Sequence, residues 1–206
     1  MGVCGTKYTS RVSPKTIDAF ATHHSLTHPP IHPINRDLCA QFEKVKETRK
    51  LKKWEKCKLI FNEGVKRIVN EGQSAYPLVR LVIPYEDNER RNYNIQNKTM
   101  IDLYIKCLGI DKTSLTAQRL RNWRNPEALK RNGVKFSQTI AGDFPKVVEN
   151  VITTQLNRET SDMTIGHINT QLDKLSKATN KEERGEVVMW MLSNLSPIEQ
   201  KWMIRV

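Results

Sequence analysis

Basic side chains crowd the stretch 44–58, where positive charge could hold the phosphates of a nucleic acid. Eight of its residues are Lys or Arg, and only two are Glu. The whole chain of 206 residues has 34 Lys and Arg against 22 Asp and Glu, a formal net charge of +12. Such an excess favours a polyanionic partner, nucleic acid before anionic membrane, although a solvated charged face is the alternative. The predicted phosphate contacts in this stretch are Arg49, Lys50, Lys52, Lys53 and Lys56.

Helix beginnings and nearby cations offer a second way to hold phosphate. The first N–H groups of a helix lack partners and carry a partial positive charge, which suits an anion. Thr164 is an N-cap type of residue, and Gly166 follows it in the first turn. Lys201 and Arg205 share one face of the last predicted helix, four residues apart. We therefore predict that these four residues contact DNA.

The stretch 125–142 is predicted to be the longest loop in the folded part of the chain. Long loops inside compact domains are often functional. Lys135 in this loop joins the predicted phosphate contacts, with a solvated connector as the alternative.

Residue patterns for catalysis are missing from the sequence. It contains no phosphate-binding G-x-x-x-x-G-K-[ST] loop, no G-x-G-x-x-G, no H-E-x-x-H and no nucleophile elbow. The acidic residues Glu86, Asp87 and Glu89 are interpreted as a solvated polar face. We predict no catalytic residue in this chain.

One histidine pair has the spacing of metal ligands. His28 and His32 are four residues apart, but zinc needs two more ligands nearby, and only Cys4 and Cys39 flank the pair. The four cysteines are spread out with no C-x-x-C pair, which favours a reducing compartment. We predict no metal site.

The elements that must position these side chains are predicted to be helices throughout. Apolar residues recur at helical spacing from residue 35 onward, and no clear alternating strand pattern is present. The expected helices cover 35–45, 51–72, 74–84, 101–109, 114–125, 143–152, 164–175, 180–195 and 196–206.

Periodicity also predicts which side chains face the core. Trp54, Phe61 and Leu115 are expected to point inward. On the last helix the predicted apolar stripe is Ile198, Trp202 and Val206, and Ser196 with Glu199 forms a capping box.

The chain is predicted to have two parts, an arm and a domain. Residues 1–35 carry four prolines and little apolar periodicity, which indicates a disordered arm. Residues 36–206 are expected to form one all-α domain, C-terminally incomplete because the last helix ends without a cap. The start of the arm matches the N-myristoylation pattern at Gly2, with Cys4 placed for a second acylation. A lipid-anchored adaptor is therefore the alternative function.

Several motifs together resemble the N-terminal helical domain of eukaryotic ATP-dependent DNA ligases, above all the end-joining ligases. They follow one another in order from about residue 36 to the end. These motifs are SAYPLVRLVIP at 74–84, ER at 89–90, YNI at 93–95, LYI at 103–105, LRNWRNP at 120–126, AGDF at 141–144, MTIGHIN at 163–169, LD at 172–173 and SPIEQKWMIR at 196–205.

The resemblance implies an α-helical module that grips duplex DNA on either side of a nick, largely across the minor groove and without sequence preference. In this family a following nucleotidyltransferase domain and an OB-fold seal the nick with ATP and Mg²⁺. The family's nucleotide-binding lysine lies in a K-x-D-G motif that does not occur here, so this chain alone is expected to bind DNA but not to ligate it. The implied role is double-strand break repair by non-homologous end joining, in the nucleus.

The resemblance also implies protein partners. In related ligases the first two helices dock a short peptide of the end-processing nuclease Artemis, for which Leu38, Phe42, Trp54 and Phe61 are candidate groove residues here. A role for these four residues in the core is the favoured alternative. The family's coiled-coil scaffold partner binds BRCT repeats that this chain does not contain. A peptide-docking module without DNA affinity is thus a further alternative function.

Overall fold

The regular elements in the computed structural model are helices. The structure describes residues 35–206 apart from 49, 71–73, 91–92, 94 and 126–141, and within these ranges no β-strand is present. This confirms the all-α prediction, whereas the predicted arm lies almost wholly outside the described residues. The elements are α2 (Asn35–Glu47), α3 (Lys53–Asn70), α4 (Tyr76–Val82), η1 (Pro84–Glu86), η2 (Asn88–Arg90), α5 (Asn97–Cys107), α6 (Leu115–Arg121), α8 (Phe144–Gln155), α9 (Ile165–Lys177), α10 (Lys181–Asn194) and α11 (Pro197–Arg205).

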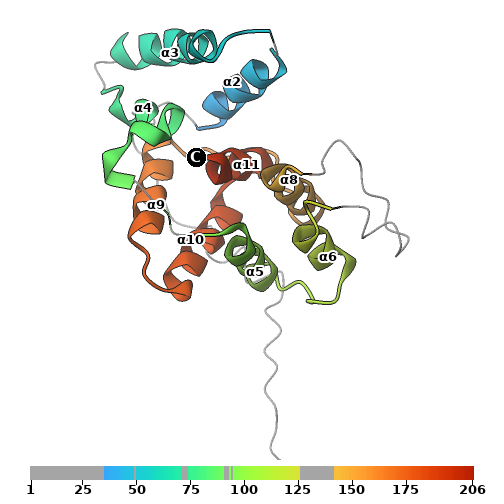
Figure 1. The fold of residues 1–206 in the computed structure, drawn as a ribbon. Helices are drawn as coiled ribbons and strands as arrows, with labels where there is room; N and C mark the ends of the chain where they lie inside the picture. Colours follow the sequence, from blue (N-terminus) through green and yellow to red (C-terminus); the bar gives the residue numbers. More distant parts are fainter. Residues whose placement is uncertain (1–34, 49, 71–73, 91–92, 94, 126–141) are drawn as a thin grey trace, which may run out of the picture.

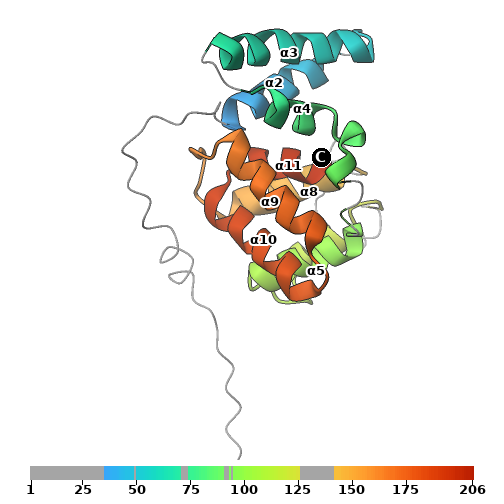
Figure 2. The ribbon, with the colours of Figure 1, turned by 90° about the vertical axis from the view of Figure 1, so that its left-hand side faces the viewer.

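The helices form a body with a helical hairpin across one end. In two perpendicular views α2 and α3 lie together above the body, and α5 and α10 lie at its opposite end (Figures 1 and 2). The hairpin reaches the body through α11, which contacts α2, and through α4, which contacts α3. Within the described part of the chain, no helix is long and apolar enough to span a membrane.

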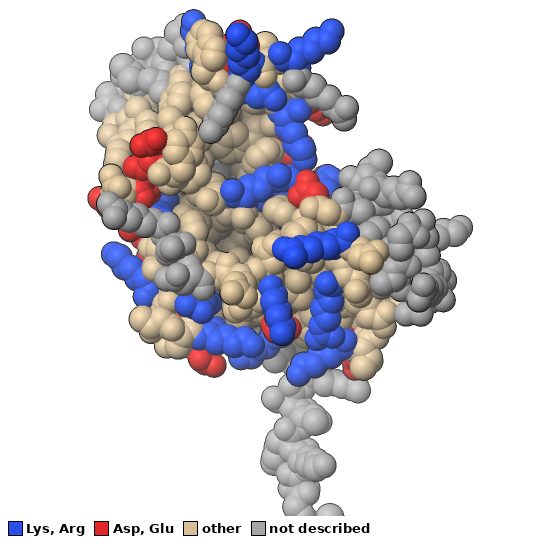
Figure 3. Space-filling view, in the orientation of Figure 1, with Lys and Arg blue, Asp and Glu red and all other residues tan. Residues whose placement is uncertain are grey.

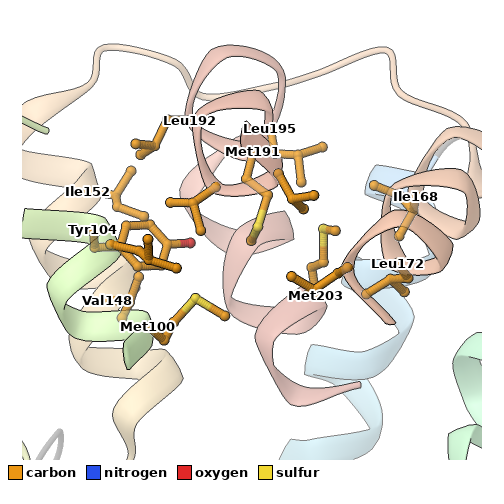
Figure 4. Close-up of a cluster of buried hydrophobic side chains, with 14 of the residues drawn as sticks. Met100, Tyr104, Val148, Ile152, Ile168, Leu172, Met191, Leu192, Leu195 and Met203 are labelled. Atoms are coloured by element: carbon orange, nitrogen blue, oxygen red, sulfur yellow. The ribbon is translucent and has the colours of Figure 1, made fainter. Parts of the chain in front are cut away.

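The core of the body lies between α5, α8, α9, α10 and α11. Figure 4 shows apolar side chains from these helices, among them Met100, Val148 and Met191, converging around Tyr104. Tyr104 is fully buried, and its hydroxyl donates a hydrogen bond to Oε1 of Gln200 on α11 over 3.1 Å. Burial raises the pKa of the Tyr104 phenol well above its ordinary value, so this group remains a donor.

Polar residues begin several of the helices as predicted. The Asp143 side chain accepts from the Lys146 N–H, the Thr164 side chain accepts from the His167 N–H, and the Asn180 side chain accepts from the Glu183 N–H. On α11 the carboxylate of Glu199 accepts from both N–H and O–H of Ser196, at 2.9 and 2.6 Å. These bonds satisfy backbone or cap donors that a helix start otherwise leaves unpaired, so local sequence fixes where these helices begin.

A buried ionic cluster fixes α4 and η2 to α9. Arg80 donates to Asp87 over 2.7 Å and to Asp173 over 2.9 Å, and Arg90 donates to Asp173 over 2.6 Å and to Asn169 Oδ1 over 2.6 Å. Asp87 is buried, so its interpretation as part of a solvated face was wrong. The two arginines supply the pairing that makes burial of the Asp87 carboxylate tolerable, and they join it to the partly exposed Asp173 of α9.

Two side chains expected in the core lie on the surface. Trp54 is 60% exposed on α3, and Leu115 is also exposed at the start of α6. Helical spacing predicts which residues share a face, but a face is buried only where another element covers it. Phe61, by contrast, is partly buried against the core as predicted.

Helix α11 buries polar residues instead of its predicted apolar stripe. Glu199, Gln200 and Lys201 are almost completely buried, whereas Ile198, Trp202 and Val206 are only half-buried. The reason lies in its neighbours, because α11 packs against α8 and α2 and meets the Tyr104 hydroxyl. Those neighbours supply hydrogen-bonding partners for polar side chains, which removes most of the penalty of burying them.

Candidate nucleic-acid interface

A surface groove joins the start of α5, the end of α6, the start of α8 and the end of α11. It consists of two adjoining hollows of about 730 and 300 Å³ that share Asn97 and Trp123. We call it the basic groove. Its charged lining residues are Lys98, Asp102, Arg121, Arg124, Asp143 and Arg205.

Local structure positions the cations on the α5–α6 side of the groove. Arg121 lies in the last turn of α6, where a cation complements the helix dipole, and it donates to the Lys112 carbonyl over 2.7 Å. Arg124 stacks on the Trp123 ring at 4.7 Å, and that ring packs against Phe144 at 5.7 Å between centroids. Within the described part of the chain, a backbone carbonyl and an aromatic ring therefore hold these two guanidinium groups in place.

The first turn of α5 forms the opposite wall of the same hollow. Gln96 precedes this helix in an extended conformation, and its side chain makes no cap hydrogen bond. Lys98 is exposed in this first turn. Uncapped N–H groups beside an ammonium group make this helix start suitable for an anionic oxygen.

The α8–α11 side of the groove is organised by one carboxylate. Asp143 caps α8 and also pairs with Arg205 of α11 and with Lys46 of α2, the latter at 3.4 Å. Although partial burial alone would raise it, the pKa of Asp143 is lowered below its ordinary value because the neighbouring Arg205 and Lys46 stabilise the anion. Arg205 also lies over the Trp202 ring at 5.2 Å.

Positive charge predominates over this face of the molecule. Among the described residues that line the groove, four are cations and two are carboxylates, and one of those carboxylates is already paired twice. Figure 3 shows Lys and Arg side chains gathered on the face that carries α5, α6 and α11, with few acidic side chains among them. Such a surface attracts phosphate oxygens from several directions.

The structure brings one of the predicted contacts, Arg205, into the basic groove. Lys201, four residues earlier, is 1% exposed and is paired with Glu43 of α2 and with Glu149 of α8 at 3.0 Å. We call Lys201, Glu43 and Glu149 the ionic joint. Its burial corrects the prediction that Lys201 contacts DNA, because no phosphate reaches an ammonium group enclosed by two carboxylates.

The other predicted contacts lie elsewhere or outside the described residues. Lys50 and Lys52 are exposed between α2 and α3, and Lys56 is half-exposed on α3. Thr164 is buried as the cap of α9, and Gly166 is half-buried in its first turn. Arg49, Lys135 and the side chain of Lys53 lie outside the described part of the structure, as do the motif at Gly2 and Cys4 and the pair His28 and His32.

The predicted peptide-docking residues separate into two groups. Leu38 is buried, and Phe42 and Phe61 are partly buried against the core, with Phe42 stacked on Trp202 at 4.8 Å. Trp54 alone of the four is exposed. Within the described ranges, no three His, Cys, Asp or Glu side chains gather in a way that could hold a metal ion.

Sequence reasoning missed Lys98, Arg121 and Arg124 as a group. Arg121 and Arg124 lie within the LRNWRNP motif, which was the one available signal. Their convergence with Lys98 depends on how α5 packs against α6, and the spacing of the residues does not reveal it.

Comparisons with known proteins agree with this architecture. The family model for the DNA ligase N terminus matches residues 35–206. A DNA ligase 4 from Phaeosphaeria nodorum is 33% identical over 136 residues, which cover 66% of this chain and 13% of that protein. DNA ligase 4 from Cryptococcus neoformans is 29% identical over 170 residues, covering 82% of this chain and 15% of that protein.

A third relative comes from another organism. DNA ligase 4 of Dictyostelium discoideum is 30% identical over 140 residues, covering 66% of this chain and 12% of that protein. The chain therefore spans about an eighth of the length of these relatives. Because the family model covers more than half of the chain, the resemblance predicted from the motifs is confirmed. The chain belongs to the DNA ligase N terminus family and corresponds to the N-terminal region of DNA ligase 4 proteins.

Proposed function

We propose that this domain binds double-stranded DNA, including nicked duplexes, through the sugar–phosphate backbone and without sequence preference. The observation that carries the proposal is the basic groove. Its cations come from the start of α5, from the end of α6 and the residues after it, and from the end of α11. The domain that carries this groove belongs to the DNA ligase N terminus family.

The chemistry of the groove suits phosphate better than base edges. Lys98, Arg121, Arg124 and Arg205 are charged donors, and the open start of α5 adds backbone N–H groups. Contacts of this kind position a duplex without reading its sequence. A domain that serves a nick at any sequence needs this property.

The wider role follows from the relatives. We propose that the domain serves a longer ATP-dependent DNA ligase that uses Mg²⁺ and acts in the nucleus, in double-strand break repair by non-homologous end joining. In this proposal, other regions of such a ligase seal the nick and bind a coiled-coil scaffold partner. Those regions correspond to the parts of the relatives that this chain does not match.

The proposal is tested with the 206-residue chain and a fluorescent nicked duplex. Binding should weaken steeply with salt, because each phosphate contact releases counterions. The double variant Arg121→Glu/Arg124→Glu should reduce affinity by about tenfold or more at every sequence. The matched control is Lys177→Glu/Lys181→Glu, which reverses two exposed charges at the α9–α10 connection, outside the basic groove.

Two results would count against the proposal. If the wild-type chain shows no affinity for duplex DNA, the proposed function fails. If the control loses as much affinity as the groove variant, binding depends on net charge and the basic groove is not the interface.

Exposed apolar residues on α3 favour a second candidate function, the docking of a short peptide. Trp54 and Leu59 are exposed there, and the Lys58 ammonium lies 5.6 Å from the Trp54 ring. We propose a peptide of an end-processing nuclease as the ligand. Quenching or shift of Trp54 fluorescence on titration with such a peptide, lost in Trp54→Leu, would support it. No change in the fluorescence or affinity of the wild type would count against it.

A further inference from the structure

Helix α2 is connected to the basic groove although it does not line it. Lys46 of α2 and Arg205 of α11 both contact Oδ2 of Asp143. Phe42 of α2 stacks on Trp202, the ring over which Arg205 lies. Glu43 accepts a hydrogen bond from Nε1 of the same Trp202 over 2.7 Å. Each of these contacts ends on Arg205 or on a group that touches it.

We propose that α2 controls how readily Arg205 leaves Asp143 for a DNA phosphate, with Lys46 as the positioning residue. This inference rests on the proposed function, because it assigns a regulatory role to a neighbour of the same groove.

The release of Arg205 depends on the charge balance of Asp143. Its carboxylate is fixed in place because it caps α8 through the Lys146 N–H. With Arg205 as sole partner, the carboxylate would retain that guanidinium and repel an approaching phosphate. With Lys46 as a second partner, the carboxylate stays neutralised when Arg205 turns toward DNA, so the exchange of partners is easier.

Exposure makes this exchange feasible. The side chains of Lys46, Asp143 and Arg205 are 46%, 29% and 26% exposed, so water reaches all three groups and can solvate them while they exchange partners. The α2–α3 hairpin reaches the body through contacts of α2 with α11 and of α3 with α4. A ligand that shifts this hairpin would therefore change DNA affinity through Lys46, which links a partner on α3 to the groove.

The direct test compares two lysines on the same helix. Lys46→Met should weaken binding of a nicked duplex about threefold more than Lys44→Met, the size expected for one partly exposed ion pair. Lys44 is exposed two residues earlier on α2, so both variants lose one charge from one helix. Lys46→Met should also make the salt dependence of binding shallower. The slope of log affinity against log salt should fall by the amount expected for about one lost phosphate contact, relative to Lys44→Met.

A second background isolates the role of Asp143. Asp143→Asn removes the negative charge but retains a good N-cap, so α8 keeps its start. When Asp143→Asn is also present, Lys46→Met should reduce affinity for the nicked duplex no more than Lys44→Met does. Lys46→Arg, which keeps the charge, should bind like the wild type. Unfolding temperatures of all variants are measured alongside, to compare only folded proteins.

The outcomes separate the two proposals. Equal losses for Lys46→Met and Lys44→Met, or a Lys46→Met loss that persists unchanged with Asp143→Asn, would overturn this inference while the groove variants still support DNA binding. Failure of the wild-type chain to bind any duplex would overturn the proposed function and this inference together.

Discussion

The ionic joint and the basic groove use two cations that lie one helical turn apart on α11, yet the two regions differ in what surrounds the charge. Lys201 is enclosed by Glu43 and Glu149, while Arg205 lies at the groove and shares the carboxylate of Asp143 with Lys46. A buried cation needs its partners, so it is committed to holding helices together. An exposed cation that makes weak pairs can exchange them, so it is available to a ligand.

This difference corrects a simple interpretation of basic residues. In the sequence Lys201 and Arg205 are equivalent, since both are cations on one helix face. In the structure one joins α11 to α2 and α8, and the other faces the groove. Charge type alone therefore does not show whether a cation is available to a phosphate; the number of carboxylates fixed around it is the better guide.

The largest expected effect is a difference in protein stability between substitutions of Lys201 and of Arg205. Lys201→Met should lower the free energy of unfolding by about 3–5 kcal/mol, because two carboxylates then face each other in a largely buried site. Arg205→Met should lower it by less than about 1 kcal/mol, as for an exposed ion pair, while weakening DNA binding. Urea denaturation and duplex titration of both variants measure this. Similar stability losses in the two variants would break the comparison.

A smaller effect tests whether the lysines of the α2–α3 hairpin contribute to DNA binding, as the cations of the basic groove are proposed to do. Reversal of Lys50, Lys52 and Lys56 to Glu should reduce duplex affinity about fivefold if these side chains approach phosphates, since each lost contact also reduces the salt dependence. The measurement is anisotropy at several salt concentrations, beside Arg121→Glu/Arg124→Glu. Unchanged affinity would remove the hairpin from the interface and leave the basic groove as the site.

The smallest expected effect concerns pH and the joint. Burial alone would raise the pKa of Glu43, but Lys201 and Trp202 together lower it below the ordinary value of 4.5. A lowered folded-state pKa contributes stability that is present above about pH 4.5 and is lost as the pH falls through the folded-state value. Glu43→Gln should therefore show a shallower loss of unfolding free energy on acidification than the wild type.

Denaturant titrations at several pH values measure this slope. Glu182→Gln, which neutralises an exposed carboxylate on α10, controls for the change in net charge. An unaltered slope in Glu43→Gln would show that the joint does not depend on the charge of Glu43.

Much of the local structure was predictable from the sequence. Asp143, Thr164, Asn180 and Ser196 begin helices because a side chain near each start pairs with the first free donors. Gly109 ends α5 in a left-handed conformation with φ of 62°, as expected for a glycine after a helix. The collinear motifs identified the family, which the comparisons confirmed.

The site was less predictable. Of the predicted contacts that the structure describes, only Arg205 lies in the basic groove, and Lys98, Arg121 and Arg124 were not predicted as contacts. Trp54 shows the same difficulty with apolar residues, because its helical spacing is that of a core residue while its side chain is largely exposed on α3.

The sequence by itself determined the all-α class, the capped starts of α8, α9, α10 and α11, the positive charge and the family. These depend on interactions between residues a few positions apart, or on composition, and both can be read along the chain. Only the tertiary structure decided that Lys201 is buried, that Arg205 reaches the groove, and that Lys98 lines the same hollow as Arg121 and Arg124. Those outcomes depend on which helices pack together, since burial and the local dielectric around a charge are set by neighbours distant in sequence.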